Sequence, residues 1–283
     1  MDFYLNFYAP SLKKNLNLKE LTFRQFFTLN KFITNNNQAH ISQCFDDIIL
    51  ENLKEKEYFY QLTNFDKFIG LYLLRSSCIS PEVELKSGAN TAKIPLYPFL
   101  IKCVDKKVET NSIIIINDVE LQLNLPKNLY SSNTFDIIYD TIYNIKINKK
   151  NINLFELKIE EKNKIIEELP AQIFTKVKSY CNEIEKQYSD LILEFKLFID
   201  SKITINPFNN SMFEILKAFY QTDLISLYEL QYILVNKLLY SAEYVDNNTL
   251  IENILLSNFY KAEIEKINAE QNKSLDKSVS LSK

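Results

Sequence analysis

The chain has 283 residues, of which 46% are hydrophobic and 24% are charged, a balance typical of a folded protein rather than a disordered one. It has only two glycines, Gly70 and Gly88, and a single histidine, His40. These counts exclude a glycine-rich phosphate loop, a dinucleotide fingerprint, a nucleophile elbow and a histidine-rich zinc site.

The formal net charge of −3 and the choice of cations argue against nucleic-acid binding. Arginine occurs only at Arg24 and Arg75, and the remaining cations are lysines. A nucleic-acid-binding protein usually has a basic excess and arginine-rich patches. We therefore expect no nucleic-acid partner.

The cysteines and the apolar runs indicate a soluble protein of a reducing cytoplasm. No two cysteines are near enough in sequence to form a CxxC pair, so we expect reduced thiols that pack as small apolar groups and hold no metal. Met1–Pro10 lacks the cationic start of a secretory signal, and no apolar run approaches the roughly 20 residues of a membrane span. The cysteines are Cys44, Cys78, Cys103 and Cys181.

The first 80 residues are predicted to be mainly helical after an N-terminal arm or short strand. Thr22 and Gln25 have the spacing of a capping box, and Thr63 caps a later helix whose apolar residues recur at helical spacing. Asp66 and Arg75 are expected to organise these helices, although they lie too far apart on one helix to pair with each other. The predicted helices begin at Thr22, at about Ala39 and at Thr63.

The middle of the chain changes character at Pro81. Residues 113–116 and 119–125 have the pattern of two strands, and Asn117-Asp118 suits the tight turn between them. Residues 94–104 are left open between strand and short helix. A helix is predicted for 134–145, and the Asn- and Lys-rich stretch 144–153 is predicted to connect two domains.

The rest of the chain is predicted to be helical with one pair of strands. Helices are expected at 158–168 and 171–188, and a capping box is expected at Ser211, followed by an almost entirely apolar helix over 224–239. A last helix, capped by Thr249 with Glu252, is expected to reach about Ala269, with Phe259, Ile264 and Ile267 on one face. Strands are expected at 193–199 and 202–205.

Together these patterns predict an α+β fold, predominantly helical, with a small antiparallel β module between helical blocks. The predicted parts are an N-terminal arm (1–20), a helical block (21–143) with a β insertion (81–126), a connector (144–153), a helical C-terminal domain (154–270) and a disordered tail (271–283).

No catalytic site emerges from the residues. His40 stands just before a predicted helix, and the pairs Asp46-Asp47, Glu160-Glu161 and Glu167-Glu168 are typical of solvated helix faces with lysines nearby. We predict no enzymatic activity, no cofactor, no metal and no small-molecule substrate. An enzyme remains a competing hypothesis, which predicts a cleft with convergent polar groups and shifted pKa values.

Tyrosines gather around the predicted helix 224–239. Tyrosine serves cores and interfaces alike, so core packing is the alternative to partner binding. The apolar helix must be covered by the fold or by a partner. We predict partner binding at Tyr228, Tyr232 and Tyr244.

Three stretches of the chain carry a family resemblance through their order. They are Leu21–Phe27 with Leu62–Phe68 and Leu73–Ser77; the β module 81–126; and Asp223–Leu234 with Ser241–Val245, Asn247–Thr249 and Glu252. In this order they resemble the T-even-type bacteriophage baseplate hub proteins, which are hub subunits or hub-assembly factors. Their motifs are structural rather than chemical, and the likeness covers most of residues 20–265. Some relatives carry a cysteine-rich insert in the β module, but here only Cys78 and Cys103 are nearby, so no metal is carried over.

The resemblance implies a non-enzymatic protein that assembles, or forms part of, the baseplate hub of a contractile phage tail. Its partners would be other tail proteins, and it would act in the host cytoplasm during assembly, either leaving as a chaperone or staying in the virion. A generic cytoplasmic helical adaptor or regulatory protein is the alternative.

Overall fold

The computed structural model describes residues 3–87, 90–133, 136, 139–147, 150–154, 157–196 and 200–280. The fold is α+β and mainly helical, with small antiparallel sheets between the helices, as predicted. Its buried apolar side chains form one connected core, from Phe7 in the first strand to Leu250 at the start of the last helix.

The N-terminal residues, predicted to be an arm or a short strand, form a β-hairpin. β1 (Tyr4–Ala9) pairs antiparallel with β2 (Lys14–Lys19), and Phe7, Leu16 and Leu18 are buried. The alternation at Leu16 and Leu18 places both side chains on one face of the strand, which packs against the helical core.

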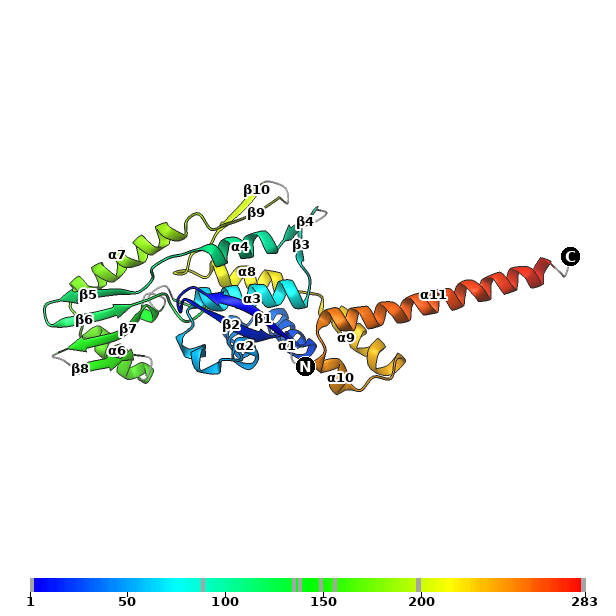
Figure 1. The fold of residues 1–283 in the computed structure, drawn as a ribbon, viewed down its shortest axis with the longest axis horizontal. Coiled ribbons are helices and arrows are strands. Elements are labelled where there is room, and N and C mark those ends of the chain that lie inside the picture. Colours follow the sequence, from blue (N-terminus) through cyan, green and yellow to red (C-terminus); the bar gives the residue numbers. More distant parts are fainter. Residues whose placement is uncertain are drawn as a thin grey trace.

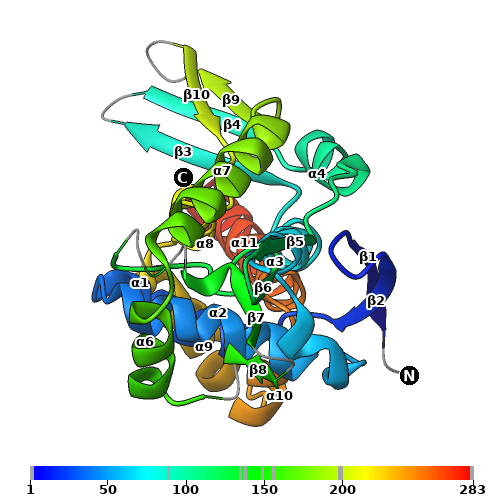
Figure 2. The same cartoon turned by 90° about the vertical axis from the view of Figure 1, so that its left-hand side faces the viewer.

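Helix α3 (Asn64–Cys78) is central to the core, and the first hairpin and helices from earlier and later in the chain pack against it (Figures 1 and 2). The capping boxes predicted at Thr22 and Thr63 are both confirmed. α1 (Phe23–Thr34), α2 (Gln38–Asn52) and the short 3-10 helix η1 (Lys56–Gln61) precede α3, and α8 (Ser211–Tyr220) packs on it from much later in the chain.

The β insertion is longer and more mixed than predicted. β3 (Glu82–Ser87) and β4 (Asn90–Pro95) form a hairpin, and helix α4 (Tyr97–Asp105) follows. Residues 88 and 89, between the two strands, lie outside the described residues. β5 (Ser112–Ile116) and β6 (Val119–Leu123) form the predicted hairpin around Asn117-Asp118.

The predicted helix 134–145 is correct at Asp136, Tyr139 and Asp140, which the structure describes as helical, but a strand begins at Ile142, and the predicted connector 144–153 is part of a sheet. β7 (Ile142–Ile147) and β8 (Lys150–Asn153) continue the sheet, whose strand order is β5-β6-β7-β8 with every neighbouring pair antiparallel. Ile142 and Ile145 are buried in this sheet. A strand that pairs with β6 across a long loop leaves little local signal in the sequence.

After the sheet, α6 (Ile159–Glu167) and α7 (Ala171–Tyr188) confirm the two predicted helices on either side of Leu169-Pro170. β9 (Ile192–Lys196) and β10 (Asp200–Thr204) confirm the predicted strand pair, and β9 lies beside β4. Part of the predicted first strand, 197–199, lies outside the described residues, and Asp200-Ser201, which separate the two predicted strands, belong to β10.

The chain ends in a group of helices at the opposite end of the molecule from the four-stranded sheet (Figure 1). α9 (Leu224–Tyr232) continues into a π-helical turn, η3 (Ile233–Lys237), and α10 (Ala242–Asn247) leads to α11 (Leu250–Ser280). Residues 271–280, predicted to be disordered, extend α11, since no glycine or proline stands there to end the helix. Within the described residues, no helix is both long and apolar enough to cross a membrane.

Candidate functional site

Exposed apolar side chains concentrate in the C-terminal helices. Among the described residues, sixteen large apolar side chains are exposed, and ten of them lie between 225 and 267. We call these ten the C-terminal apolar set. They are Ile225, Tyr228, Tyr232, Leu239, Tyr244, Ile254, Leu255, Phe259, Ile264 and Ile267.

Helix α9 presents one exposed apolar face. Ile225, Tyr228 and Tyr232 are spaced at i, i+3 and i+7, so their side chains share that face, while Leu227 points into the core. The Asp223 side chain caps the helix by accepting from the backbone N–H groups of Ile225 and Ser226. The Ser226 hydroxyl also donates to this carboxylate, which lowers the pKa of Asp223.

The structure brings two of the three predicted tyrosines together. Tyr228 and Tyr232 line a shallow hollow of about 380 Å³ with Glu229 and Ile233. The Tyr228 ring also meets Phe27 of α1 edge to face, with ring centroids 4.8 Å apart. Tyr244 does not line the hollow. Core packing, the alternative reading of these tyrosines, does not account for their exposure, since each ring is about half exposed.

Tyr244 instead stacks on Tyr240, with ring centroids 5.1 Å apart. Between the two tyrosine groups, Leu239 has a left-handed backbone (φ 59°) and a side chain that is 82% exposed. A leucine at φ > 0 is unusual, because its Cβ crowds the backbone there. The Tyr240 N–H donates to the Leu234 carbonyl at 3.1 Å, which closes the turn after η3.

The predicted apolar helix 224–239 therefore ends earlier and is covered on one side only. Leu227 and Leu234 are its buried residues. The exposure of Leu239 was not predicted, since no local pattern marks a leucine at the αL position. Phe259, Ile264 and Ile267 were predicted to share one face of the last helix, and each of these side chains is exposed.

Helix α11 is firmly attached where it leaves the body. Its predicted cap is confirmed: Glu252 accepts from the Thr249 N–H at 2.7 Å, and the Glu252 N–H donates to Thr249 Oγ1 at 3.3 Å. Buried Asn253 donates to the Val245 carbonyl at 2.8 Å. The helix then projects away from the other elements (Figure 1). Its exposed residues Phe259, Ile264 and Ile267 follow buried Ser257 along the helix.

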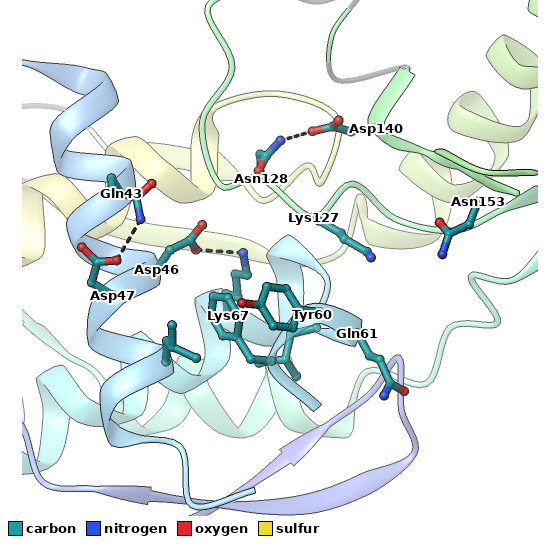
Figure 3. Close-up of a pocket in the computed structure, with 13 residues that line it drawn as sticks. Gln43, Asp46, Asp47, Tyr60, Gln61, Lys67, Lys127, Asn128, Asp140 and Asn153 are labelled. Carbon is teal, nitrogen blue, oxygen red and sulfur yellow. Dashed lines mark hydrogen bonds and ion pairs between the residues drawn. The ribbon is translucent and has the colours of Figure 1, made fainter. Parts of the chain in front are cut away.

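A polar cleft that the sequence analysis did not predict lies between α2, η1, α3 and the stretch 127–153. It encloses about 760 Å³, and it shares four lining residues with a neighbouring hollow of about 420 Å³. Figure 3 shows its charged and amide side chains converging from these elements. The four shared residues are Gln43, Asp46, Asn128 and Asp140.

Two ion pairs line the joined hollows. Lys67 Nζ lies 2.8 Å from Asp46 Oδ1, and Lys162 Nζ lies 3.2 Å from Asp140 Oδ1, with little exposure of either lysine side chain. Burial raises the pKa of Asp46 above its ordinary value, although Lys67 opposes the shift. Burial lowers the pKa of Lys127 to about 8, and the positive charge of Lys67 adds to this effect.

The lining of the larger cavity limits its chemistry. Its described lining residues include carboxylates, amides, lysines and Tyr60, but no serine, cysteine or histidine. Across the described chain, no three His, Cys, Asp or Glu side chains gather as a metal site. The cleft can therefore hold a polar ligand, and Lys127 is the side chain in it with the most strongly shifted amine pKa.

Comparisons with known proteins found no matching family model, no matching curated protein and no matching solved structure.

Proposed function

We propose that this protein is a non-enzymatic assembly factor or structural subunit that binds other proteins through its C-terminal helices. The observation that carries the proposal is the C-terminal apolar set: of the sixteen large apolar side chains that are exposed in the described part of the chain, ten lie within the 43 residues 225–267. Large exposed apolar areas on a folded protein are typical of protein–protein contact sites.

The partner is a protein with an apolar face that covers α9 and the projecting part of α11. The resemblance to baseplate hub proteins supports other phage tail proteins as this partner. On that reading the protein acts in the host cytoplasm during tail assembly, and it either leaves the particle or remains in the tail baseplate.

The test is affinity capture of the full-length tagged chain from infected cells, with mass spectrometry of purified virions beside it. We expect other tail proteins in the capture. A double variant, I225K/Y232K, places charge on the exposed face of α9 and should lose them. Y97K on α4, which is equally exposed but far from this face, is the matched control and should keep them.

The results separate the readings. Tail proteins captured by the wild type and found with this protein in virions identify a structural subunit, and capture without presence in virions identifies a chaperone. Capture of a defined non-tail partner supports the generic adaptor. If no tail protein is captured, or I225K/Y232K captures as well as Y97K does, the proposal is wrong.

The polar cleft favours a second candidate function, an enzyme or receptor for a small polar ligand. It provides the concave site, convergent polar groups and shifted pKa values that an enzyme requires. A screen of polar metabolites by thermal shift tests this candidate. A ligand that stabilises the wild type but not K127Q supports it, and a lack of any stabilising ligand counts against it.

A further inference from the structure

Strand β5 is an edge of the four-stranded sheet, and within the described residues it pairs with β6 alone. The two strands are joined by the two-residue turn Asn117-Asp118, in which Asn117 has φ 52°. A two-residue hairpin closes on a hydrogen-bonded pair, here Ile116 and Val119, and hydrogen-bonded pairs then alternate along the ladder. Ile114 therefore bonds to β6, whereas the N–H and C=O groups of Ile113 and Ile115 point away from it.

The same two residues have exposed side chains. Ile113 is 63% exposed and Ile115 is 69% exposed, and they lie on the outer face of the sheet opposite Gln122 and Glu120. Ile114 faces the other way, opposite buried Leu121. At Ile113 and Ile115, then, outward main-chain groups and exposed apolar side chains occur together on one edge.

The sequence of β5 lacks two of the features that normally prevent strand pairing, charge and proline. Natural edge strands are protected by charged residues, proline, bulges or a covering segment. β5 reads Ser-Ile-Ile-Ile-Ile, with no charge and no proline. The one register shift among the described strands of this sheet lies between β6 and β7. The chain entering β5 is also held in place, because Tyr180 of α7 donates a hydrogen bond to the Thr110 carbonyl.

We propose that β5 pairs antiparallel with β5 of a second copy of this chain, about a two-fold axis at Ile114. Ile113 then lies opposite the partner's Ile115, and Ile115 opposite the partner's Ile113. Each of these two pairs exchanges two main-chain hydrogen bonds, about four in all. The two four-stranded sheets become one sheet of eight strands.

The strand is complementary to itself, which is why a second copy fits it. In this register Asn111 lies opposite the partner's Asn117, and Thr110 opposite the partner's Asp118, so no like charges meet. Four isoleucine side chains gather on the outer face, where each copy alone leaves two in solvent. An isologous contact of this kind closes on itself and does not propagate into a fibre.

The experiment measures the mass of the full chain by light scattering and sedimentation from low to high micromolar concentration. We expect a concentration-dependent species of twice the 33.3 kDa chain mass. I113K/I115K places like charges opposite each other at both pairs and should leave only the monomer. I113E/I115K places a glutamate opposite a lysine at both pairs and should restore the dimer.

Two controls complete the design. Q122K puts a charge on the same sheet face but on β6, and it should leave the dimer unchanged. I225K/Y232K should also leave it unchanged, so that loss of tail-protein capture and loss of dimerisation are separate results. Circular dichroism checks that each variant is folded.

A wild type that stays monomeric throughout the range overturns the proposal, as does a dimer that survives I113K/I115K. A folded I113E/I115K variant that remains monomeric while the wild type dimerises overturns the antiparallel register.

Discussion

At the scale of single residues, Asp66 connects the first hairpin to the central helix. Its fully buried carboxylate accepts hydrogen bonds from the Thr63 N–H at 2.8 Å, the Thr63 hydroxyl at 2.7 Å and the Ser11 N–H at 3.1 Å, and the Ser11 hydroxyl donates to it as well. Ser11 lies in the turn between β1 and β2, so one carboxylate caps α3 and holds that turn. Asp66 was predicted to organise the helices, but the hairpin that it holds was not predicted.

We expect D66N to reduce the free energy of unfolding by about 1–3 kcal/mol. D66N replaces one carboxylate oxygen with an NH₂ group. In one orientation of the amide this group faces the Thr63 N–H, and in the other it faces the Ser11 N–H, so one of these donors loses its acceptor. Urea denaturation of the wild type and D66N measures the difference. D105N, at an exposed position at the end of α4, is the control and should change stability little. Equal stability of D66N and the wild type would show that these hydrogen bonds contribute nothing.

The amine of Lys127 gives a prediction about pH. Because burial lowers its pKa to about 8, the neutral, nucleophilic form predominates above pH 8, whereas an ordinary lysine reaches that point only near 10.5. Acylation of Lys127 by an amine-reactive ester should therefore rise with a midpoint near pH 8. Residue-resolved mass spectrometry follows the rate, with exposed Lys102 as the comparison. A midpoint above pH 10 would contradict the shift.

The cysteines give the opposite prediction, low reactivity. All four are free and buried, and burial raises the pKa of the Cys44, Cys78 and Cys181 thiols to about 12. Thiolate is the reactive form, so very little of it is present at pH 8. In the native protein a disulfide reagent should react at the rate of unfolding, and all four thiols should react at once in denaturant. One fast thiol in the native protein would show a local opening.

At the scale of elements, Gly70 explains how the first hairpin lies so close to α3. A Cβ atom at this position would lie 3.1 Å from Ile49 Cδ1 and 3.3 Å from Leu18 Cδ1, so α2 and β2 both approach the helix at its glycine. We expect G70V to cost about 1–3 kcal/mol in the free energy of unfolding, because the added methyl groups force these elements apart. S77V, on the exposed side of the same helix, is the control. A stable G70V would mean that the hairpin moves without cost.

The elements that sequence analysis placed correctly carry their own local signals. The caps at Thr22, Thr63 and Thr249 depend on residues three positions apart, and all three are confirmed. The box predicted at Ser211 is wrong. The Ser211 hydroxyl instead donates to the Asn206 carbonyl and accepts from the Asn206 N–H, and the loop 205–210 that allows this contact has no periodic pattern.

The elements that were missed depend on distant partners. β7 has the isoleucines of a helix stripe, and only its pairing with β6 makes it a strand. The candidate site shows the same difference. Tyr228 and Tyr232 could be predicted as partner-binding residues from composition and helical spacing, whereas the exposure of Leu239 depends on a left-handed turn that no local pattern reveals. The cleft brings α2 and α3 together with residues 127–153, and no local pattern reports that contact.

At the scale of the whole molecule, the two halves of the chain share their core. Tyr220 of α8 donates to the Leu71 carbonyl at 2.7 Å, and Arg75 Nε donates to the Phe219 carbonyl at 2.6 Å. Tyr188 of α7 packs edge to face on Phe65, with ring centroids 4.8 Å apart. Helix α3 is thus buried by elements from both sides of the boundary that was predicted at 144–153.

This packing predicts one cooperative unfolding transition and a fragment that cannot fold alone. The fragment 1–153 lacks α7 and α8, so Tyr72, Phe65 and the Leu71 carbonyl would face water, and we expect no cooperative thermal transition from it. Adding the fragment 154–283 supplies both helices and should restore native-like ellipticity. Calorimetry of the full chain should give equal calorimetric and van't Hoff enthalpies. A fragment 1–153 that unfolds cooperatively by itself would establish the boundary near 144–153 and would show that α7 and α8 cover a domain that is already stable.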